Sequence, residues 1–154
     1  MVVVEMKQKS QINILSLLTP KQFTFFVSDD ISIRAFLEKA DYHKFTVVPV
    51  LDEDGKYIGS LSEGDILRYI KNVAGFSLEN AEGTSIREVE RYRSYTAARI
   101  SVDIEEVLTL LLSQNFVPLV DDRGVFIGII KRSSVLGKLR LNNELVWKEG
   151  ENRK

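Results

Sequence analysis

The chain has 154 residues, 44% of them hydrophobic and 28% charged, which is typical of one folded domain or of two small halves that share a core. Its 21 Lys and Arg residues nearly balance its 22 Asp and Glu residues, so no overall charge attracts nucleic acid or an anionic membrane. Cysteine is absent, which excludes disulfides, thiolate metal sites and a cysteine nucleophile. We find neither a signal peptide nor an apolar run of membrane-spanning length, and we expect a cytoplasmic protein without nucleic-acid or membrane partners.

The first predicted elements are a short strand at 24–28 (TFFVS) and a helix whose apolar residues recur at helical spacing from Ile31 onward. Asp30 stands at the expected N-cap of this helix. At 46–61, TVVPVLDEDGKYIGSL has two apolar runs joined by an acidic turn with glycine, which predicts a β-hairpin. The periodic segment DILRYIKNV at 65–73 predicts a second helix.

The same order of elements returns in the second half of the chain, after a linker that ends in a short helix. There we expect a strand at 97–101, a helix at 104–111 with Asp103 as its N-cap, a hairpin at 115–130 and a final helix at 133–141. The expected cap precedes the hairpin proline by 19 residues in the first half and by 15 in the second. The second-half helix should therefore be about one turn shorter.

An internal repeat with an offset of 69 residues accounts for this order. Residues 46–67 align with residues 115–136, and seven of the 22 positions are identical. The identical pairs are Val48 and Val117, Pro49 and Pro118, Asp52 and Asp121, Gly55 and Gly124, Ile58 and Ile127, Gly59 and Gly128, and Leu67 and Leu136. Two glycines and a proline among the identities indicate two copies of one structural unit.

Each copy follows the order β-α-β-β-α. A unit of roughly 60 residues buries little core alone, so we expect the two copies to pack their sheets together into one α+β module. The predicted divisions are a first domain at 10–73, a linker at 74–85, a second domain at 86–141 and a C-terminal tail at 142–154.

Several motifs of the first copy, in order along the chain, resemble those of a CBS (cystathionine β-synthase) domain. They are Thr-Pro at 19–20, V-P-V at 48–50, D-x-x-G at 52–55 and G-x-x-S-x-x-D at 59–65. The second copy is similar but weaker, and the resemblance extends over roughly residues 10–140. It implies tandem CBS repeats packed as a pseudo-twofold CBS pair, also called a Bateman module.

The resemblance further implies a stand-alone bacterial regulatory protein rather than an enzyme. Its cleft would bind an adenine nucleotide (AMP, ADP or ATP), and an unidentified protein partner would receive the signal. Family members commonly form homodimers, and we expect the helix faces with Leu67 and Ile70 to join two copies. No cofactor or metal is expected, and His43, the single histidine, should lie at the surface. A module that only oligomerises, with an empty cleft, is the alternative.

Ser62 and Asp65 are the strongest candidates for ligand contacts in the first copy. They stand three residues apart where a strand turns into a helix, so both side chains should project beside the helix N-terminus. A carboxylate there can accept both hydroxyl hydrogens of a ribose, and the Ser62 hydroxyl with nearby N–H groups suits a phosphate. The alternative is that the two residues only cap the helix.

The second copy replaces these groups with others. Ser134 stands at the position of Asp65, and a neutral hydroxyl cannot replace a bidentate acceptor. Lys131 and Arg132 add two cations at the start of the last helix. We expect one copy to recognise the nucleoside and the cations of the other to neutralise its phosphate; a solvated basic pair is the alternative.

The resemblance also places a further set of residues in the cleft: Lys21, Phe23, Thr24, Thr46, Val47 and Pro49. Phe23, Phe25 and Phe26 are expected to form an aromatic core cluster, from which one ring could flank a base.

Lys21, Thr46 and the basic pair also resemble stand-alone CBS-pair proteins of Gram-positive bacteria that bind cyclic di-AMP. Those proteins can lack S-x-x-D in the first domain and carry adjacent arginines where this chain has Lys-Arg-Ser at 131–133. Cyclic di-AMP is therefore the second ligand that we predict. If neither residue contacts a ligand, Lys21 is a solvated loop cation and Thr46 an ordinary strand residue.

Overall fold

The computed structural model describes residues 3–6, 12–77, 79–90, 94–141 and 145–148. The strands are β1 (Val3–Met6), β2 (Leu18–Pro20), β3 (Val27–Ser28), β4 (Val47–Leu51), β5 (Tyr57–Ser62), β6 (Ala98–Arg99), β7 (Phe116–Val120), β8 (Phe126–Lys131) and β9 (Leu145–Lys148). The α-helices are α1 (Ile33–His43), α2 (Glu63–Asn72), α3 (Ile104–Leu111) and α4 (Arg132–Leu141). Short 3₁₀ turns lie at Ile14–Leu17, Lys21–Phe23, Asn80–Glu82 and Ile86–Glu88.

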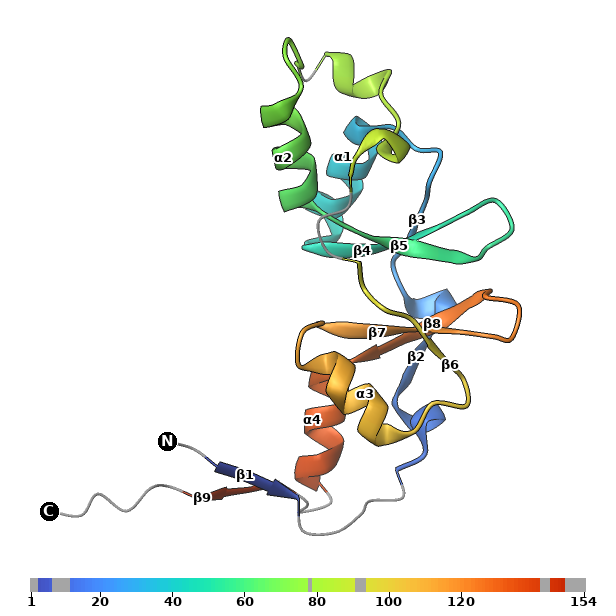
Figure 1. Ribbon diagram of the computed structural model, residues 1–154, viewed down its shortest axis with the longest axis vertical. Helices are drawn as coiled ribbons and strands as arrows, with labels where there is room; N and C mark the ends of the chain where they lie inside the picture. Colours follow the sequence, from blue (N-terminus) through green and yellow to red (C-terminus); the bar gives the residue numbers. More distant parts are fainter. Residues whose placement is uncertain (1–2, 7–11, 78, 91–93, 142–144, 149–154) are drawn as a thin grey trace, which may run out of the picture.

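Two sheets lie across the middle of the molecule, and the helices cover their outer sides (Figure 1). One sheet has the strand order β3-β4-β5, and the other has the order β2-β8-β7-β6. Helices α1 and α2 lie at one end of the molecule, and α3 and α4 lie at the other. The predicted α+β fold with two β-α-β-β-α repeats is confirmed.

The predicted hairpins are β4-β5 and β7-β8, which pair antiparallel. Gly55 and Gly124 adopt φ values of 78° and 82° in the two turns, a conformation that favours glycine. In each turn one aspartate oxygen accepts two backbone N–H groups, at Asp52 and at Asp121. The backbone N–H of Val125 contributes most to holding the pKa of Asp121 below its ordinary value of 3.8.

The two hairpin turns bind each other across the pseudo-twofold axis. The Tyr57 N–H donates to the Gly124 carbonyl at 3.2 Å, and the Phe126 N–H donates to the Gly55 carbonyl at 3.0 Å. Each bond becomes the other when 69 is added to or subtracted from its residue numbers. The repeated turn sequence therefore also forms a contact between the two halves.

A mainly aromatic cluster fills the space between the sheets. Its buried members are Leu51, Tyr95, Phe116, Phe126 and Ile129, with Phe26, Val47 and Tyr57 packed against them. Because the cluster draws on both halves, the two copies share one core, as the small size of each copy predicted.

Strand β2 joins the sheet of the second half, although it lies within the predicted first domain at 10–73. It pairs antiparallel with β8, with Pro20 opposite Gly128. A Cβ on Gly128 would lie 2.2 Å from the Thr19 carbonyl oxygen, and Gly128 has φ 153°. The repeated glycine at this position thus admits a crossing strand, which the sequence did not predict.

The hydrophobic cores show a reciprocal exchange of segments. Ile14 and Leu17 are buried in the core of the second half, with α3 and α4. Ala81, Ile86 and Val89 are buried in the core of the first half. Both segments pack on the half to which the predicted domain divisions, which stay a prediction, do not assign them.

The prediction of Asp30 as the N-cap of α1 is wrong. Ser32 caps the helix instead, and its hydroxyl accepts the Ala35 N–H at 3.1 Å. Backbone hydrogen bonds join residues 31–33 to residues 84–86 and hold the segment before the helix extended. The helix therefore begins two residues later than predicted.

The second-half helix agrees with its prediction. Asp103 caps α3 and accepts the Glu106 N–H at 2.8 Å. Helix α3 has 8 residues against 11 in α1, close to the predicted difference of one turn. The predicted strands at 24–28 and 97–101 are shorter in the structure and reduce to β3 and β6.

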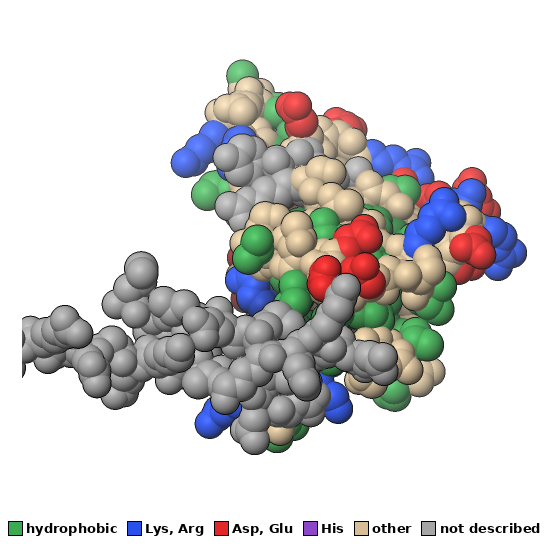
Figure 2. Space-filling model, turned by 60° about the horizontal axis from the view of Figure 1, so that its bottom comes forward, with side chains coloured by type: hydrophobic (Ala, Val, Ile, Leu, Met, Phe, Trp, Pro, Cys, Tyr) green, Lys and Arg blue, Asp and Glu red, His purple; other side chains and the backbone are tan. Residues whose placement is uncertain are grey.

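The surface carries both signs of charge. On the face in Figure 2, basic and acidic side chains both occur among apolar and neutral ones, in keeping with the balanced composition. Among the described residues, no helix is both long and apolar enough to cross a membrane. Strands β1 and β9 pair antiparallel near the chain ends, and the rest of the predicted tail lies outside the described residues.

Candidate functional site

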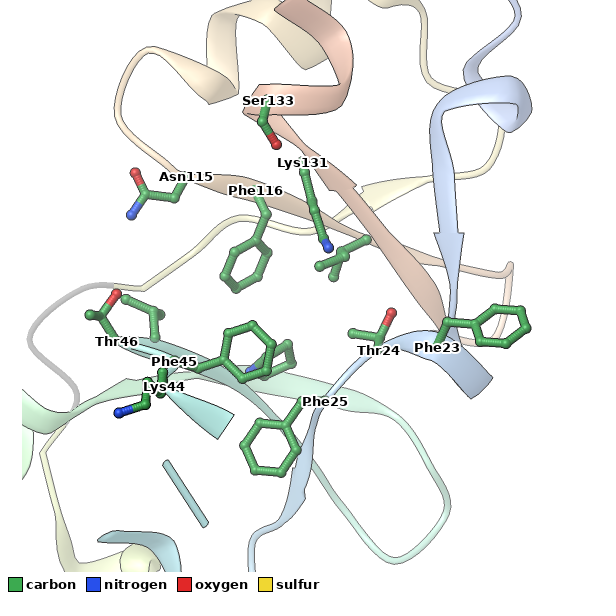
Figure 3. A pocket seen from close by; sticks show the side chains of 13 residues that line it. Phe23, Thr24, Phe25, Lys44, Phe45, Thr46, Asn115, Phe116, Lys131 and Ser133 are labelled. Atoms are coloured by element: carbon green, nitrogen blue, oxygen red, sulfur yellow. The ribbon is translucent and has the colours of Figure 1, made fainter. Parts of the chain in front are cut away.

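A pocket of about 270 Å³ opens between the two halves, where β8 runs into α4 and β4 begins (Figure 3). Its lining consists of Phe23, Thr24, Phe25, Lys44, Phe45, Thr46, Val47, Pro49, Asn115, Phe116, Ile129, Lys131 and Ser133. We call it the lysine pocket, because it has two lysines and no carboxylate among these residues.

Aromatic rings form much of the wall of the lysine pocket. The Phe25 and Phe45 rings are stacked with centroids 5.5 Å apart, and His43 stacks on Phe25 at 4.3 Å. Phe116 projects into the pocket from the opposite sheet (Figure 3). Ring faces and edges of this kind suit a flat, mainly apolar group such as a nucleobase.

Two polar side chains of the lysine pocket, Lys131 and Ser133, lie at the start of α4. Lys131 is the last residue of β8, and its ammonium group points into the space between the sheets (Figure 3). The Ser133 hydroxyl, in the first turn of α4, faces the same space. A cation, a hydroxyl and the N-terminal end of a helix together suit a phosphate group.

A second pocket, of about 320 Å³, lies at the equivalent position of the first half. Its lining consists of Thr46, Val47, Ser60, Ser62, Glu63, Gly64, Asp65, Arg68 and Tyr95. Ser62 pairs with Val47 at the end of the first hairpin, and Lys131 pairs with Phe116 at the same place in the second. We call this pocket the carboxylate pocket.

Ser62 and Asp65 form a complete capping box at the start of α2. Asp65 Oδ2 accepts the Ser62 N–H at 2.8 Å and the Ser62 hydroxyl at 2.7 Å. The Ser62 Oγ atom in turn lies 3.1 Å from the Asp65 nitrogen, whose N–H it accepts. The capping interpretation of the S-x-x-D motif is therefore realised in the structure.

Arg68 lies one helical turn after Asp65 and approaches its other oxygen. The Arg68 guanidinium is 3.5 Å from Asp65 Oδ1. The Asp65 side chain is only 4% exposed, whereas that of Arg68 is 47% exposed. Both oxygens of this buried carboxylate thus already have partners within α2 and its cap.

The structure divides the predicted site residues between the two pockets. The lysine pocket includes Phe23, Thr24, Thr46, Val47, Pro49 and Lys131. The carboxylate pocket includes Ser62 and Asp65 and shares Thr46 and Val47. Asp65 and Lys131, which we expected to serve one ligand, lie on different pockets.

Arg132 does not accompany Lys131 into the lysine pocket. Its guanidinium donates to the Leu111 carbonyl at 2.9 Å and to the Gln114 carbonyl at 2.7 Å. Leu111 is the last residue of α3, where carbonyl groups lack helical partners, and Gln114 lies in the segment that follows the helix. The predicted phosphate contact of Arg132 and its solvated alternative are both replaced by a capping role.

Three other predicted residues lie elsewhere than expected. Lys21 lines neither pocket, and its Nζ is 5.1 Å from the centroid of the Phe26 ring. Ser134 is also absent from both linings, and its neighbour Ser133 takes that place. Phe23 is 73% exposed, so its assignment to an aromatic core was wrong.

Several lining residues were missed, although the repeat pointed to some of them. Asn115 and Phe116 stand 69 residues after Thr46 and Val47, so the offset alone identifies them. Lys44 and Phe45 carry no such signal, because their place depends on the left-handed turn that ends α1, where Lys44 has φ 56°.

The described residues contain no cluster of three or more His, Cys, Asp or Glu side chains that could hold a metal ion. His43, at the end of α1, is exposed as predicted and packs against aromatic rings.

Solved structures of several proteins have the same fold. A CBS domain protein from Streptococcus pneumoniae is 26% identical, with a TM-score of 0.76 over 84% of this chain and 87% of that one. CbpB of Listeria monocytogenes in complex with cyclic di-AMP is 21% identical, with a TM-score of 0.72 over 86% and 98%. CBSX2 in complex with AMP is 26% identical, with a TM-score of 0.67 over 84% and 98%.

The family model for the CBS domain matches this sequence twice, at residues 21–72 and 85–141. The two matches coincide with the two repeats, and the sheets that those repeats form are stacked in the middle of the molecule. The chain belongs to the CBS domain family and is a CBS pair.

Proposed function

We propose that this CBS pair is a regulatory module that binds an adenine nucleotide in the lysine pocket and passes the bound state to a protein partner. The observation that carries the proposal is the Lys131 ammonium group, which points into a pocket walled by Phe25, Phe45 and Phe116. A cation beside aromatic rings matches a ligand that joins a phosphate to a flat base.

AMP, ADP and ATP are the ligands that we place first. The lysine pocket has room left between its rings, so the alternative of a cleft plugged by Phe23 or Phe25 finds no support. CBSX2, at 26% identity, was solved with AMP, which adds support for this ligand class. The base would lie against the rings, and the phosphate would lie between Lys131 and the start of α4.

Cyclic di-AMP is the second candidate. The lysine pocket offers more than one aromatic surface, and a ligand with two adenines could use two of them. CbpB, which shares the fold, was solved with this ligand. Its two phosphates would require a second cation besides Lys131, and Lys44 is the other lysine in the lining.

The experiment is a thermal-shift panel with AMP, ADP, ATP, cyclic di-AMP, S-adenosylmethionine and GTP. A ligand present at about a hundred times its Kd stabilises the folded state by about 2.7 kcal/mol, which raises the Tm of a protein of this size by about 5–10 °C. We expect the largest shift with an adenine nucleotide. A panel without a shift would contradict the proposal, and a shift with GTP alone would change the ligand class.

A further inference from the structure

Phe23 differs from the other aromatic residues that line the lysine pocket. Its side chain is 73% exposed, and its ring points away from the rings of Phe25 and Phe45 (Figure 3). In the part of the chain that the structure describes, no aromatic ring contacts Phe23, whereas Phe25 and Phe116 each pack against another ring. A large apolar side chain therefore lies at the rim of the pocket with most of its surface in water.

The backbone that carries Phe23 is held in place. Phe23 ends the 3₁₀ turn that follows β2, and the Thr24 N–H donates to the Lys21 carbonyl at 3.0 Å. The Thr24 hydroxyl lies 3.0 Å from the Pro20 carbonyl oxygen and 3.2 Å from that of Thr19, both in β2. Strand β2 is in turn paired with β8. The Phe23 ring can therefore change direction by rotation about its own side-chain bonds, without movement of the backbone.

We propose that the Phe23 ring is a movable wall of the lysine pocket, which turns inward to cover the flat base of a bound nucleotide. The inference rests on the proposed function, because it concerns the base of the same ligand. Staggered rotamers about one side-chain bond differ by about 120°, so a single rotation carries the ring from one side of the backbone to another. The outward ring admits the base, and the inward ring retains it.

The inward position is favourable with a base in the pocket because two flat apolar surfaces then leave water together. The base would lie between Phe23 on one side and the rings of Phe45 and Phe116 on the other (Figure 3). Aromatic rings prefer offset-stacked or edge-to-face contacts, and a base with rings on two sides can form both kinds.

Phe23 and Lys131 would act on different parts of the ligand. Lys131 acts on the phosphate group, which AMP shares with ribose 5-phosphate. Phe23 acts on the base, which AMP shares with adenosine. The affinities of the three compounds therefore separate the two roles.

The test is isothermal titration calorimetry of AMP, adenosine and ribose 5-phosphate against the full chain and its Phe23→Ala variant. The affinities for AMP and adenosine should fall by a similar factor of about 5- to 150-fold, the range for loss of a base that stacks on an aromatic side chain. The affinity for ribose 5-phosphate should stay unchanged. Phe23→Tyr should keep most of the affinity for AMP, and Phe23→Leu, an apolar cover without a ring, should fall between Phe23→Tyr and Phe23→Ala.

The rotation itself can be followed by fluorescence. The chain has a single tryptophan, Trp147, so Phe23→Trp combined with Trp147→Phe moves the only tryptophan to the rim of the pocket. Its emission should shift to shorter wavelength when AMP binds, because the indole ring leaves water. Ribose 5-phosphate, which has no base to cover, should not cause this shift.

Tyr42→Ala is the matched control. Tyr42 is another aromatic residue with an exposed side chain, at 81%, but it lies on α1 and lines neither pocket. Tyr42→Ala should leave all three affinities unchanged. Thermal unfolding of each variant verifies that it is folded.

Three results would overturn the inference. Phe23→Ala could bind AMP as tightly as the wild type, it could lose ribose 5-phosphate as strongly as AMP, or the emission of the single-tryptophan variant could stay constant at saturating AMP. Failure of the proposed function looks different, because the wild type itself then binds no AMP, and the inference falls with it.

Discussion

The lysine pocket and the carboxylate pocket occupy equivalent places in the two repeats, yet they differ in nearly every polar group. In the first repeat, the turn into the helix is closed by the hydrogen bonds of Ser62 and Asp65. In the second, the same turn presents Lys131 to the space between the sheets. The apolar core positions are similar in the two repeats, so both fold alike. The polar positions at the start of the last helix of each repeat are different. The difference shows how one repeated unit can provide one capped helix start and one helix start with an inward-pointing lysine.

The two repeats share an exposed leucine at the same position. Leu67 on α2 and Leu136 on α4 are equivalent and are 54% and 46% exposed. We predict that they join two copies of the chain, because exposed Leu side chains gain about 1.5–3 kcal/mol each when buried. Light scattering should give twice 17.5 kDa for the wild type and 17.5 kDa for the Leu67→Asp, Leu136→Asp double variant.

Leu112→Asp is the control for the dimer, since Leu112 is exposed at the end of α3 and outside the repeat alignment of helices α2 and α4. It should leave the mass at the dimer value. A wild-type mass of one chain would contradict the prediction.

Gly128 lies opposite Pro20 of β2 in the sheet of the second repeat. Gly128→Ala should lower the free energy of unfolding by about 2–4 kcal/mol, because the new Cβ meets the Thr19 carbonyl and the backbone φ is unfavourable for alanine. Gly137→Ala, in open space on α4, should raise it by about 0.5–1 kcal/mol. Urea unfolding measures both, and a neutral Gly128→Ala would show that β2 does not need the close approach.

Arg132 and Lys131 are adjacent but should respond differently to substitution. Arg132→Ala removes hydrogen bonds to two carbonyls at the end of α3, so the free energy of unfolding should fall by about 1.5–3 kcal/mol. The affinity for AMP should stay unchanged after correction for the folded fraction. A stable variant with weakened AMP binding would return Arg132 to the phosphate.

The smallest expected effect concerns Asp121, in the turn of the second hairpin. The folded pKa of Asp121 lies below 3.8, so its ionised form stabilises the fold above that pH, and this contribution is lost as the pH falls through the folded pKa. Asp121→Asn keeps an acceptor oxygen but does not titrate. The difference in Tm between wild type and variant should shrink below pH 3.8. A constant difference for Asp121→Asn across this pH range would contradict the assignment.

Local sequence signals predicted the parts of the fold that local chemistry determines. The two hairpins followed from glycines that must adopt positive φ, and α3 followed from Asp103 and its apolar spacing. The cap of α1 was misassigned because both Asp30 and Ser32 can cap a helix. The choice between them depends on backbone bonds to residues 84–86, which a local pattern does not contain.

The candidate site was predicted less completely for the same reason. The repeat identified Ser62, Asp65 and Lys131 as positions that differ, but it could not show that they line separate pockets. The direction of Arg132 depends on carbonyls at the end of α3 that come near only in the folded chain. The crossing of β2 onto β8 is likewise a long-range pairing without a local signature.

The central claim is that Lys131 holds the phosphate of an adenine nucleotide. The most direct measurement is a titration of AMP and adenosine against wild type, Lys131→Ala and Lys131→Arg at two salt concentrations. Lys131→Ala should lower the affinity for AMP by about 10- to 150-fold and leave the affinity for adenosine unchanged, since only AMP has the charged phosphate group. Its AMP affinity should also depend less on salt, and Lys131→Arg should restore most of the binding. Equal losses for AMP and adenosine, or an unchanged AMP affinity in Lys131→Ala, would contradict the claim.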